Sequence, residues 1–158
     1  MNGNTSWIVG AAALLTAVAL AVAAASTTPA AAPRAANVAH ASTLSARASR
    51  YGKILFDGRG RVLYLFARDP RGRSSCYGAC AKAWPPFLTN GAPKSLAGVN
   101  PKLLGTAKRT DGSLQVTYAK HPLYYFSKDN KPGQITCQNV SNFGGLWLVV
   151  TPNGKAVR

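Results

Sequence analysis

The chain is short of acidic side chains. Its 158 residues contain four carboxylates, all of them Asp, against 19 Lys and Arg residues, and it holds only three Cys and two His. So few acidic and metal-ligating residues argue against an acidic metal cage, a paired-carboxylate catalytic site and a zinc site. We therefore expect no catalytic residues, no metal and no cofactor, and we interpret the protein as a non-enzyme.

Residues 7–25 form a run without a charge or a proline. An apolar stretch followed by small residues such as Ala23-Ala24-Ala25 is typical of a secretory signal peptide. The run is also long enough to span a bilayer as an uncleaved anchor. Two alternatives follow for residues 1–25, a signal peptide or an N-terminal membrane anchor. Under both, the protein is extracytoplasmic, either secreted or anchored to the outer face of the cytoplasmic membrane.

Residues 26–50 contain mostly Ala, Ser, Thr, Pro and Arg, without aromatic side chains. Such a segment buries too little apolar surface to offset its chain entropy, so we expect a disordered linker that carries a solvated His40. All aromatic residues except Trp7 lie in residues 51–158, which are enough for one modest core.

Short runs of strand-forming residues alternate with turns that contain glycine in residues 51–158. This alternation is typical of antiparallel sheets. The runs are KILF (53–56), RVLYLFA (61–67), LQVTYA (114–119), PLYYFS (122–127) and LWLVV (146–150). A short helix is expected around Cys76–Trp84, where Pro85-Pro86 ends it. The predicted fold class is mainly β with one short helix.

An internal repeat follows from the segments LYLFARD (63–69) and LYYFSKD (123–129), each preceded by a turn and another strand. Two units are too few for a solenoid. We expect duplicated antiparallel meanders that share one core, with the first repeat at about 51–100 and the second at about 101–158.

The repeated motif is Tyr-x-Phe-x-x-Asp. Tyrosine and phenylalanine two positions apart point to the same face of a strand, so we expect both pairs in the core and both Asp residues in turns that they stabilise. The alternative is that the two Asp residues face each other and bind a cation or a basic ligand. The motif residues are Tyr64, Phe66 and Asp69 in the first copy and Tyr124, Phe126 and Asp129 in the second.

These motifs, the run Ser75–Ala81, Trp84-Pro85-Pro86 and the strand Gly145–Val150 together resemble one bacterial family. It is the secreted or lipoprotein repeat of unknown function with a Tyr-x-(Phe/Trp/Tyr)-x-x-Asp motif. The resemblance covers nearly all of residues 51–158. It implies an exported, often lipid-anchored envelope protein built from paired repeats, with no established catalytic residue. The chain departs from the lipoprotein-like pattern in lacking a lipobox cysteine.

Cys76 and Cys80 are spaced to form a short-range disulfide if the chain unwinds slightly at Gly78. An exported domain of this size gains from such a link. The alternative is a long-range bridge from Cys137, which lies outside the recognised motifs, to either of them. His121, between Lys120 and Pro122, is expected to be a solvated turn residue rather than a metal ligand.

Basic residues crowd the hairpin and loop around the first motif, at Arg59, Arg61, Arg68, Arg71 and Arg73. An exported basic surface attracts anionic cell-wall polymers or lipid headgroups, whereas export argues against nucleic acid as the biological partner. We expect a non-catalytic cell-envelope module with a binding or structural role. The alternative is an accessory redox or electron-transfer component that uses Cys76, Cys80 and aromatic residues. The sequence leaves the oligomeric state open.

Overall fold

The computed structural model describes residues 41–158, so the expected signal peptide or anchor, the first part of the linker and His40 lie outside the described residues. Within residues 41–158 no helix is long and apolar enough to cross a membrane. The mainly β prediction is confirmed. The strands are β1 (Thr43–Ser49), β2 (Gly52–Asp57), β3 (Tyr64–Phe66), β4 (Leu88–Thr89), β5 (Lys94–Ser95), β6 (Leu104–Lys108), β7 (Leu114–Tyr118), β8 (His121–Tyr124), β9 (Val140–Asn142) and β10 (Gly145–Val149).

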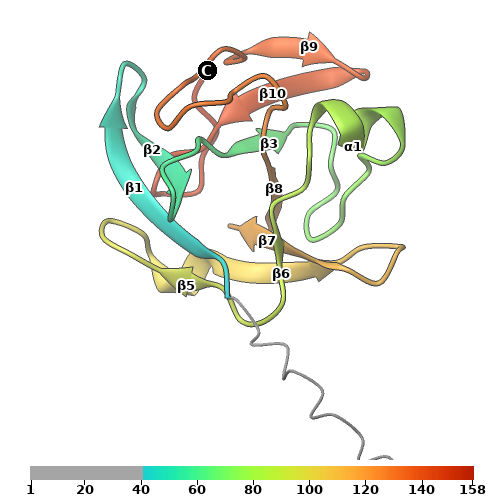
Figure 1. The fold of residues 1–158 in the computed structure, drawn as a ribbon, viewed down its shortest axis with the longest axis horizontal. Helices are drawn as coiled ribbons and strands as arrows, with labels where there is room; N and C mark the ends of the chain where they lie inside the picture. The colour runs from blue at the N-terminus through green and yellow to red at the C-terminus, as the bar shows by residue number, and fades with distance from the viewer. Residues whose placement is uncertain (1–40) are drawn as a thin grey trace, which may run out of the picture. The chain divides into compact units, whose positions relative to one another are not determined.

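The strands form two sheets. The smaller has the order β2-β1-β5, and the larger has the order β4-β7-β8-β3-β10-β9, with β6 also paired to β7. Every pair is antiparallel except β1 with β5. In Figure 1, β3 and β8 lie at the centre, β9 and β10 lie above them, and β5 and β6 lie below. The two motif strands are therefore the innermost strands of the larger sheet.

The buried side chains of the central strands divide by face, as the period of two in a strand requires. Tyr64 and Trp147 belong to one buried cluster, whereas their neighbours Leu65 and Leu148 belong to a second cluster. Each cluster contains side chains from both copies of the motif region. Burial of both strand faces explains why the motif strands contain consecutive apolar residues rather than an alternation with polar ones.

Strand β1 departs from the expected linker. Residues 44–49, which were predicted to be disordered, pair with β2, Thr43 pairs with β5, and Leu44 is fully buried. The prediction was wrong here because alanine and serine have weak strand propensity, and only the partner strand reveals why they are extended. The described fold therefore starts at Thr43 rather than at Tyr51.

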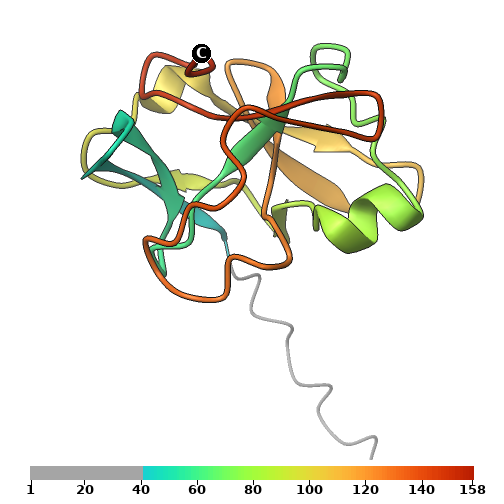
Figure 2. The ribbon, with the colours of Figure 1, turned by 90° about the horizontal axis from the view of Figure 1, so that it is seen from above.

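The helix α1 is shorter than expected and spans Ala79–Ala83. It begins after Gly78, whose φ of 55° is a conformation that favours glycine, and it ends before Pro85-Pro86. Cys76 therefore precedes the helix instead of opening it. Figure 2 shows α1 to one side of the central strands. The other helical segment of the described residues is a single 3₁₀ turn at Pro101–Leu103.

Candidate functional site

The two motifs exchange hydrogen bonds across the centre of the larger sheet. Strands β3 and β8 pair antiparallel with Tyr64 opposite Tyr124. The hydroxyl of Tyr64 donates to Asp129 Oδ2 at 2.6 Å, and the hydroxyl of Tyr124 donates to Asp69 Oδ2 at 2.5 Å. Each tyrosine thus bonds the aspartate of the other copy, and the arrangement has a local twofold relation about the Tyr64–Tyr124 pair.

The second oxygen of each aspartate holds its own loop. Asp69 Oδ1 accepts hydrogen bonds from the backbone N–H and the hydroxyl of Ser75, both at 2.7 Å. Asp129 Oδ1 accepts the same two bonds from Thr136, at 3.2 and 2.6 Å. Ser75 and Thr136 lie six and seven residues after their aspartates, so each carboxylate closes an equivalent loop. Each motif aspartate therefore stabilises its own turn, as expected, and also links the two copies through the tyrosine of the other copy.

Burial and the neighbouring carboxylates raise the pKa of both motif tyrosines far above their ordinary value. For Tyr64 the largest cause is desolvation, followed by the hydrogen bond to Asp129. For Tyr124 desolvation again comes first, followed by the charge of Asp69. Ionising either hydroxyl would place a second negative charge beside a buried carboxylate. Both tyrosines therefore remain neutral donors at physiological pH.

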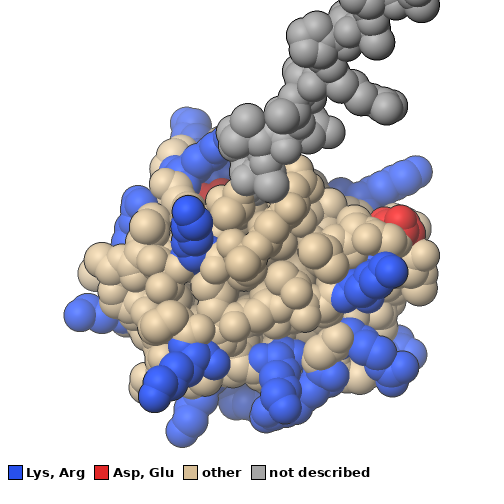
Figure 3. Space-filling view, turned by 90° about the horizontal axis from the view of Figure 1, so that it is seen from below, with Lys and Arg blue, Asp and Glu red and all other residues tan. Residues whose placement is uncertain are grey.

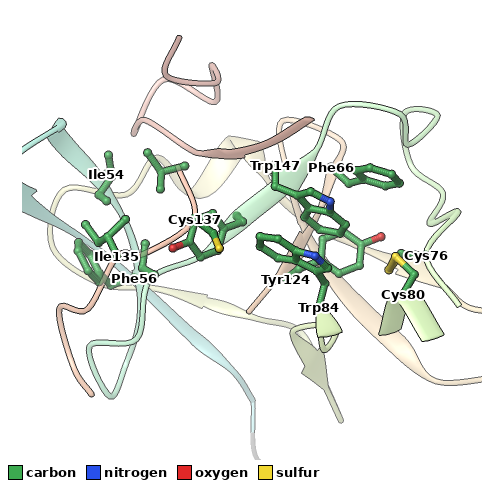
Figure 4. Close-up of a cluster of buried hydrophobic side chains, with 13 residues drawn as sticks. Ile54, Phe56, Phe66, Cys76, Cys80, Trp84, Tyr124, Ile135, Cys137 and Trp147 are labelled. Atoms are coloured by element: carbon green, nitrogen blue, oxygen red, sulfur yellow. A yellow bond between two sulfur atoms is a disulfide. The ribbon is translucent and has the colours of Figure 1, made fainter. Parts of the chain in front are cut away.

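Two stacked tryptophans complete the central cluster. The rings of Trp84 and Trp147 lie 3.9 Å apart with an interplanar angle of 4°, and Phe66 stacks on Trp147 at 4.3 Å (Figure 4). Phe126 contacts Trp84 at 4.6 Å but is only half-buried. The motif residues predicted to be core residues therefore come together, and three of the four motif aromatics, Tyr64, Phe66 and Tyr124, are at most 2% exposed. They form packing and not an open cleft.

The predicted disulfide between Cys76 and Cys80 is present, with a Cα–Cα distance of 5.2 Å. Cys137 is a buried free thiol, and burial followed by the charge of Asp129 raises its pKa. It follows Thr136 as Cys76 follows Ser75, so it occupies the matching place in the second copy rather than lying outside the motifs. Figure 4 shows Cys137 and the disulfide on opposite sides of the stacked tryptophans. Comparing the residues after each motif Asp would have revealed this equivalence.

A third carboxylate, Asp57, is also buried, at the end of β2. Its Oδ1 accepts the backbone N–H groups of Arg59 and Arg61, and its Oδ2 accepts the hydroxyl of Tyr125 at 2.9 Å. The guanidinium of Arg61 lies 4.1 Å from the centre of the Tyr125 ring. Burial, followed by the charge of Asp57, raises the pKa of Tyr125. Asp57 thus joins the β2–β3 turn to the residue that follows β8.

The surface is left almost without negative side chains. Asp57, Asp69 and Asp129 are at most 8% exposed, and Asp111 is the one exposed aspartate. Among the basic residues of the described chain, only Arg109 is buried, where its guanidinium donates to Gln115 and the Cys76 carbonyl. Figure 3 shows Lys and Arg side chains spread around one face, with little red among them. Three of the four carboxylates are therefore buried, whereas all the described Lys and Arg residues except Arg109 are at least partly exposed.

The two histidine expectations have different outcomes. His40 lies outside the described residues. His121 is not a fully solvated turn residue, because it begins β8, is half-buried, and has its Nδ1 atom buried without a hydrogen-bond partner among residues 41–158. Desolvation, followed by the charge of Arg71, lowers its pKa. No group of three His, Cys, Asp or Glu residues able to hold a metal occurs within the described residues.

Comparison with known proteins adds one finding. The profile of a family described as a secreted repeat of unknown function matches residues 45–87 and residues 105–151. The two matches cover the two copies of the motif that exchange hydrogen bonds. No curated protein and no solved structure matches the chain.

Proposed function

The chain belongs to the family of secreted repeats of unknown function, and from that premise we propose that it is an exported, non-catalytic module that binds anionic polymers of the cell envelope. The two repeats form a stable scaffold through their crossed Tyr–Asp pairs. The partner is recognised by the exposed lysines and arginines around that scaffold. The family description supports the extracytoplasmic location.

The main support for this proposal is the burial of the carboxylates. With three of four aspartates buried and hydrogen bonded, the field around the domain comes from exposed Lys and Arg with Asp111 as the one exposed opposing side chain. Such a surface raises the local concentration of polyanions and speeds their association. The interaction weakens with salt, because the screening length falls from about 10 Å at 0.1 M to about 3 Å at 1 M.

The buried motif residues support a scaffold role rather than catalysis. The hydroxyls of Tyr64 and Tyr124 are already donated to aspartates, and those aspartates also accept bonds from Ser75 and Thr136. Groups whose hydrogen bonds are satisfied inside the protein are not available to a substrate. Mutation of the motif is therefore expected to act through folding.

The disulfide also favours the scaffold over the accessory redox role. Cys76 is fully buried and Cys80 is 8% exposed. Exchange requires that a thiolate reach one of the two sulfur atoms, which burial hinders. Incubation with a glutathione redox buffer and thiol quantification distinguishes the two roles. A disulfide that opens and closes without loss of the fold would favour the redox alternative.

Sedimentation with isolated cell envelopes tests the proposed function. The full chain is mixed with intact walls and with walls from which phosphate-containing polymers have been removed by acid. Binding to intact walls, release at about 1 M NaCl and loss of binding to stripped walls are expected. Equal binding to both wall preparations, or binding that salt does not change, would contradict the proposal.

A further inference from the structure

A basic cleft lies where three segments of the chain meet. Its volume is about 350 Å³, within the range of about 300–1,000 Å³ that is typical of small-molecule sites. The basic residues that line it are Arg71 in the loop after β3, Lys102 in the 3₁₀ turn and Lys120 in the β7–β8 turn. The cleft lining contains no carboxylate. Its other residues are uncharged: Leu103, Leu104, Gly105, Thr117 and Ala119. We call this site the basic cleft.

Backbone hydrogen bonds tie the three segments together. The N–H of Gly72 donates to the Lys120 carbonyl at 2.7 Å, and the N–H of Ala119 donates to the Leu103 carbonyl at 2.8 Å. The positions next to Arg71 and Lys102 are thus joined directly to the turn that carries Lys120. The three cations are therefore presented by a connected frame rather than by independent loops.

The β7–β8 turn itself has an unusual sequence for its shape. Ala119 and Lys120 have φ values of 50° and 65°, in the left-handed region. Two-residue hairpin turns of this kind favour Asn-Gly or Gly-Gly, because side chains are strained there. Strained backbone conformations persist where the surrounding structure holds them, and they cluster at functional sites. Here the strain places a lysine at the wall of the basic cleft.

The corresponding place in the first half lacks this concentration of positive charge. The cleft beside the β2–β3 turn is lined by Arg59 together with Asp57, Tyr125 and the apolar residues Pro86 and Phe87. A carboxylate beside the arginine reduces the attraction for an anion. The surroundings of these equivalent turns therefore differ, and of the two clefts only the one beside the β7–β8 turn has several cations and no carboxylate in its lining.

We infer that the basic cleft binds the phosphate group of a phosphodiester polymer, an inference that rests on the proposed function and names its binding site. Lysine and arginine are the common protein ligands of phosphate, arginine through paired N–H donors and lysine as a point charge. A polymer fits better than a lipid surface because none of the exposed large apolar side chains, Leu88, Leu96, Leu114 and Phe143, lines the cleft.

The test measures binding of synthetic poly(glycerol phosphate) to the full chain, with dextran as the uncharged reference. The cleft variant carries Arg71→Gln, Lys102→Gln and Lys120→Gln. The control variant carries Lys53→Gln, Lys128→Gln and Lys155→Gln, three exposed residues outside the cleft lining, and therefore has the same net charge. Circular dichroism and melting temperature establish that both variants are folded.

The cleft variant is expected to bind about 30- to 100-fold more weakly at low salt, from about three- to fivefold for each exposed cation, while the control variant changes less than threefold. The slope of log affinity against log salt should decrease in size by about 2 in the cleft variant alone. Equal weakening of both variants would overturn the basic cleft but leave the proposed function standing. If the unmodified chain does not bind the polymer but still binds intact walls, the cleft inference fails alone, and if it binds neither, the proposed function fails too.

Vesicles of phosphatidylglycerol distinguish the other source of phosphate groups. Binding to vesicles that depends on the cleft residues, without binding to the polymer, would overturn the assignment to a polymer and point to lipid headgroups. Vesicle binding that is the same in the unmodified chain and the cleft variant, alongside cleft-dependent polymer binding, supports the assignment.

Discussion

The two repeats are alike in their shared motif and different in the residues beside it. At the centre, each supplies a tyrosine, an aspartate and a tryptophan, and each tyrosine bonds the other repeat's aspartate. Beside the motif, the first repeat has the Cys76–Cys80 disulfide where the second has the single thiol of Cys137. The difference teaches that the shared motif holds the two repeats together, while residues outside it are free to specialise.

The central similarity is not complete. The hydroxyl of Tyr124 lies 2.7 Å from the hydroxyl of Ser74 and also donates to Asp69. The hydroxyl of Tyr64 donates to Asp129 and has no such side-chain neighbour among its hydrogen bonds within residues 41–158. The indole N–H of Trp147 donates to the Asn142 carbonyl, whereas the buried indole nitrogen of Trp84 has no hydrogen-bond partner within residues 41–158. These differences allow the two halves of the centre to be compared by mutation.

The largest difference between the repeats is expected at the motif phenylalanines. Phe66→Ala should destabilise by about 3–5 kcal/mol, because Phe66 is buried and stacked on Trp147. Phe126→Ala should cost about half as much, since Phe126 is half-buried. Urea unfolding monitored by tryptophan fluorescence measures both free energies. Equal losses would show that the two aromatic positions are equivalent in spite of their different exposure.

The crossed pairs should show a smaller difference. A hydrogen bond to a charged group is worth about 1.5–3 kcal/mol. Asp129→Asn should be near the upper end and Asp69→Asn near the lower end, because Ser74 remains as a partner for Tyr124. A double-mutant cycle of Tyr64→Phe with Asp129→Asn isolates the pair. A coupling energy near zero would contradict the link between the repeats.

Loss of the disulfide should cost about as much as loss of one crossed hydrogen bond. The Cys76→Ala/Cys80→Ala double variant is expected to lose about 2 kcal/mol, since the closed loop is short and removes little chain entropy. Cys137→Ala serves as the comparison in the second repeat. In the native protein, a thiol reagent should label Cys137 slowly, because the thiol is buried and its pKa is raised. Rapid labelling of one thiol in the folded state would contradict this placement.

The effect of alkaline pH should be shared by both repeats, so it differs least between them. The ordinary tyrosine pKa is 10.0, and burial beside carboxylates raises it for Tyr64 and Tyr124. The unfolded chain releases these protons above about pH 10 while the folded chain keeps them. The contribution of the two tyrosines to the free energy of unfolding is therefore constant below about pH 10 and falls above it. Each group contributes about 1.4 kcal/mol per pH unit there. Tyrosinate absorbance that rises before unfolding would contradict their burial.

Strands could be predicted where their own residues and the flanking turns indicate them, and not where only a partner strand does. The runs at 53–56, 114–119 and 146–150 were found because branched and aromatic residues stand between glycine turns. Strands β1 and β6 were missed, since alanine, serine and threonine become extended there only through pairing with β2 and β7. The short-range disulfide was one of the pairings that the sequence left open, and the structure shows that it is the one formed. The position of Cys137 needed the alignment of the two loops after the motif aspartates.

Within the candidate site, the motif residues themselves were predictable but their partners were not. Asp69 was expected in a turn, and its bonds to Ser75 agree with that expectation. Its bond to Tyr124 joins residues 55 positions apart, and no local pattern reports such a contact. The basic cleft was equally hidden, because Arg71, Lys102 and Lys120 come from three segments and resemble ordinary solvated charges in the chain.

The amino-acid sequence alone determined the β-rich character, the duplication and the excess of basic residues, because composition, strand periodicity and turn residues act between near neighbours. Tertiary structure alone decided which tyrosine meets which aspartate, that three of the four carboxylates leave the surface, and where three cations converge. The physical reason is that burial and long-range hydrogen bonds arise from packing of the two repeats against each other. The charge that a partner would meet therefore depends on the folded arrangement as much as on the residue count.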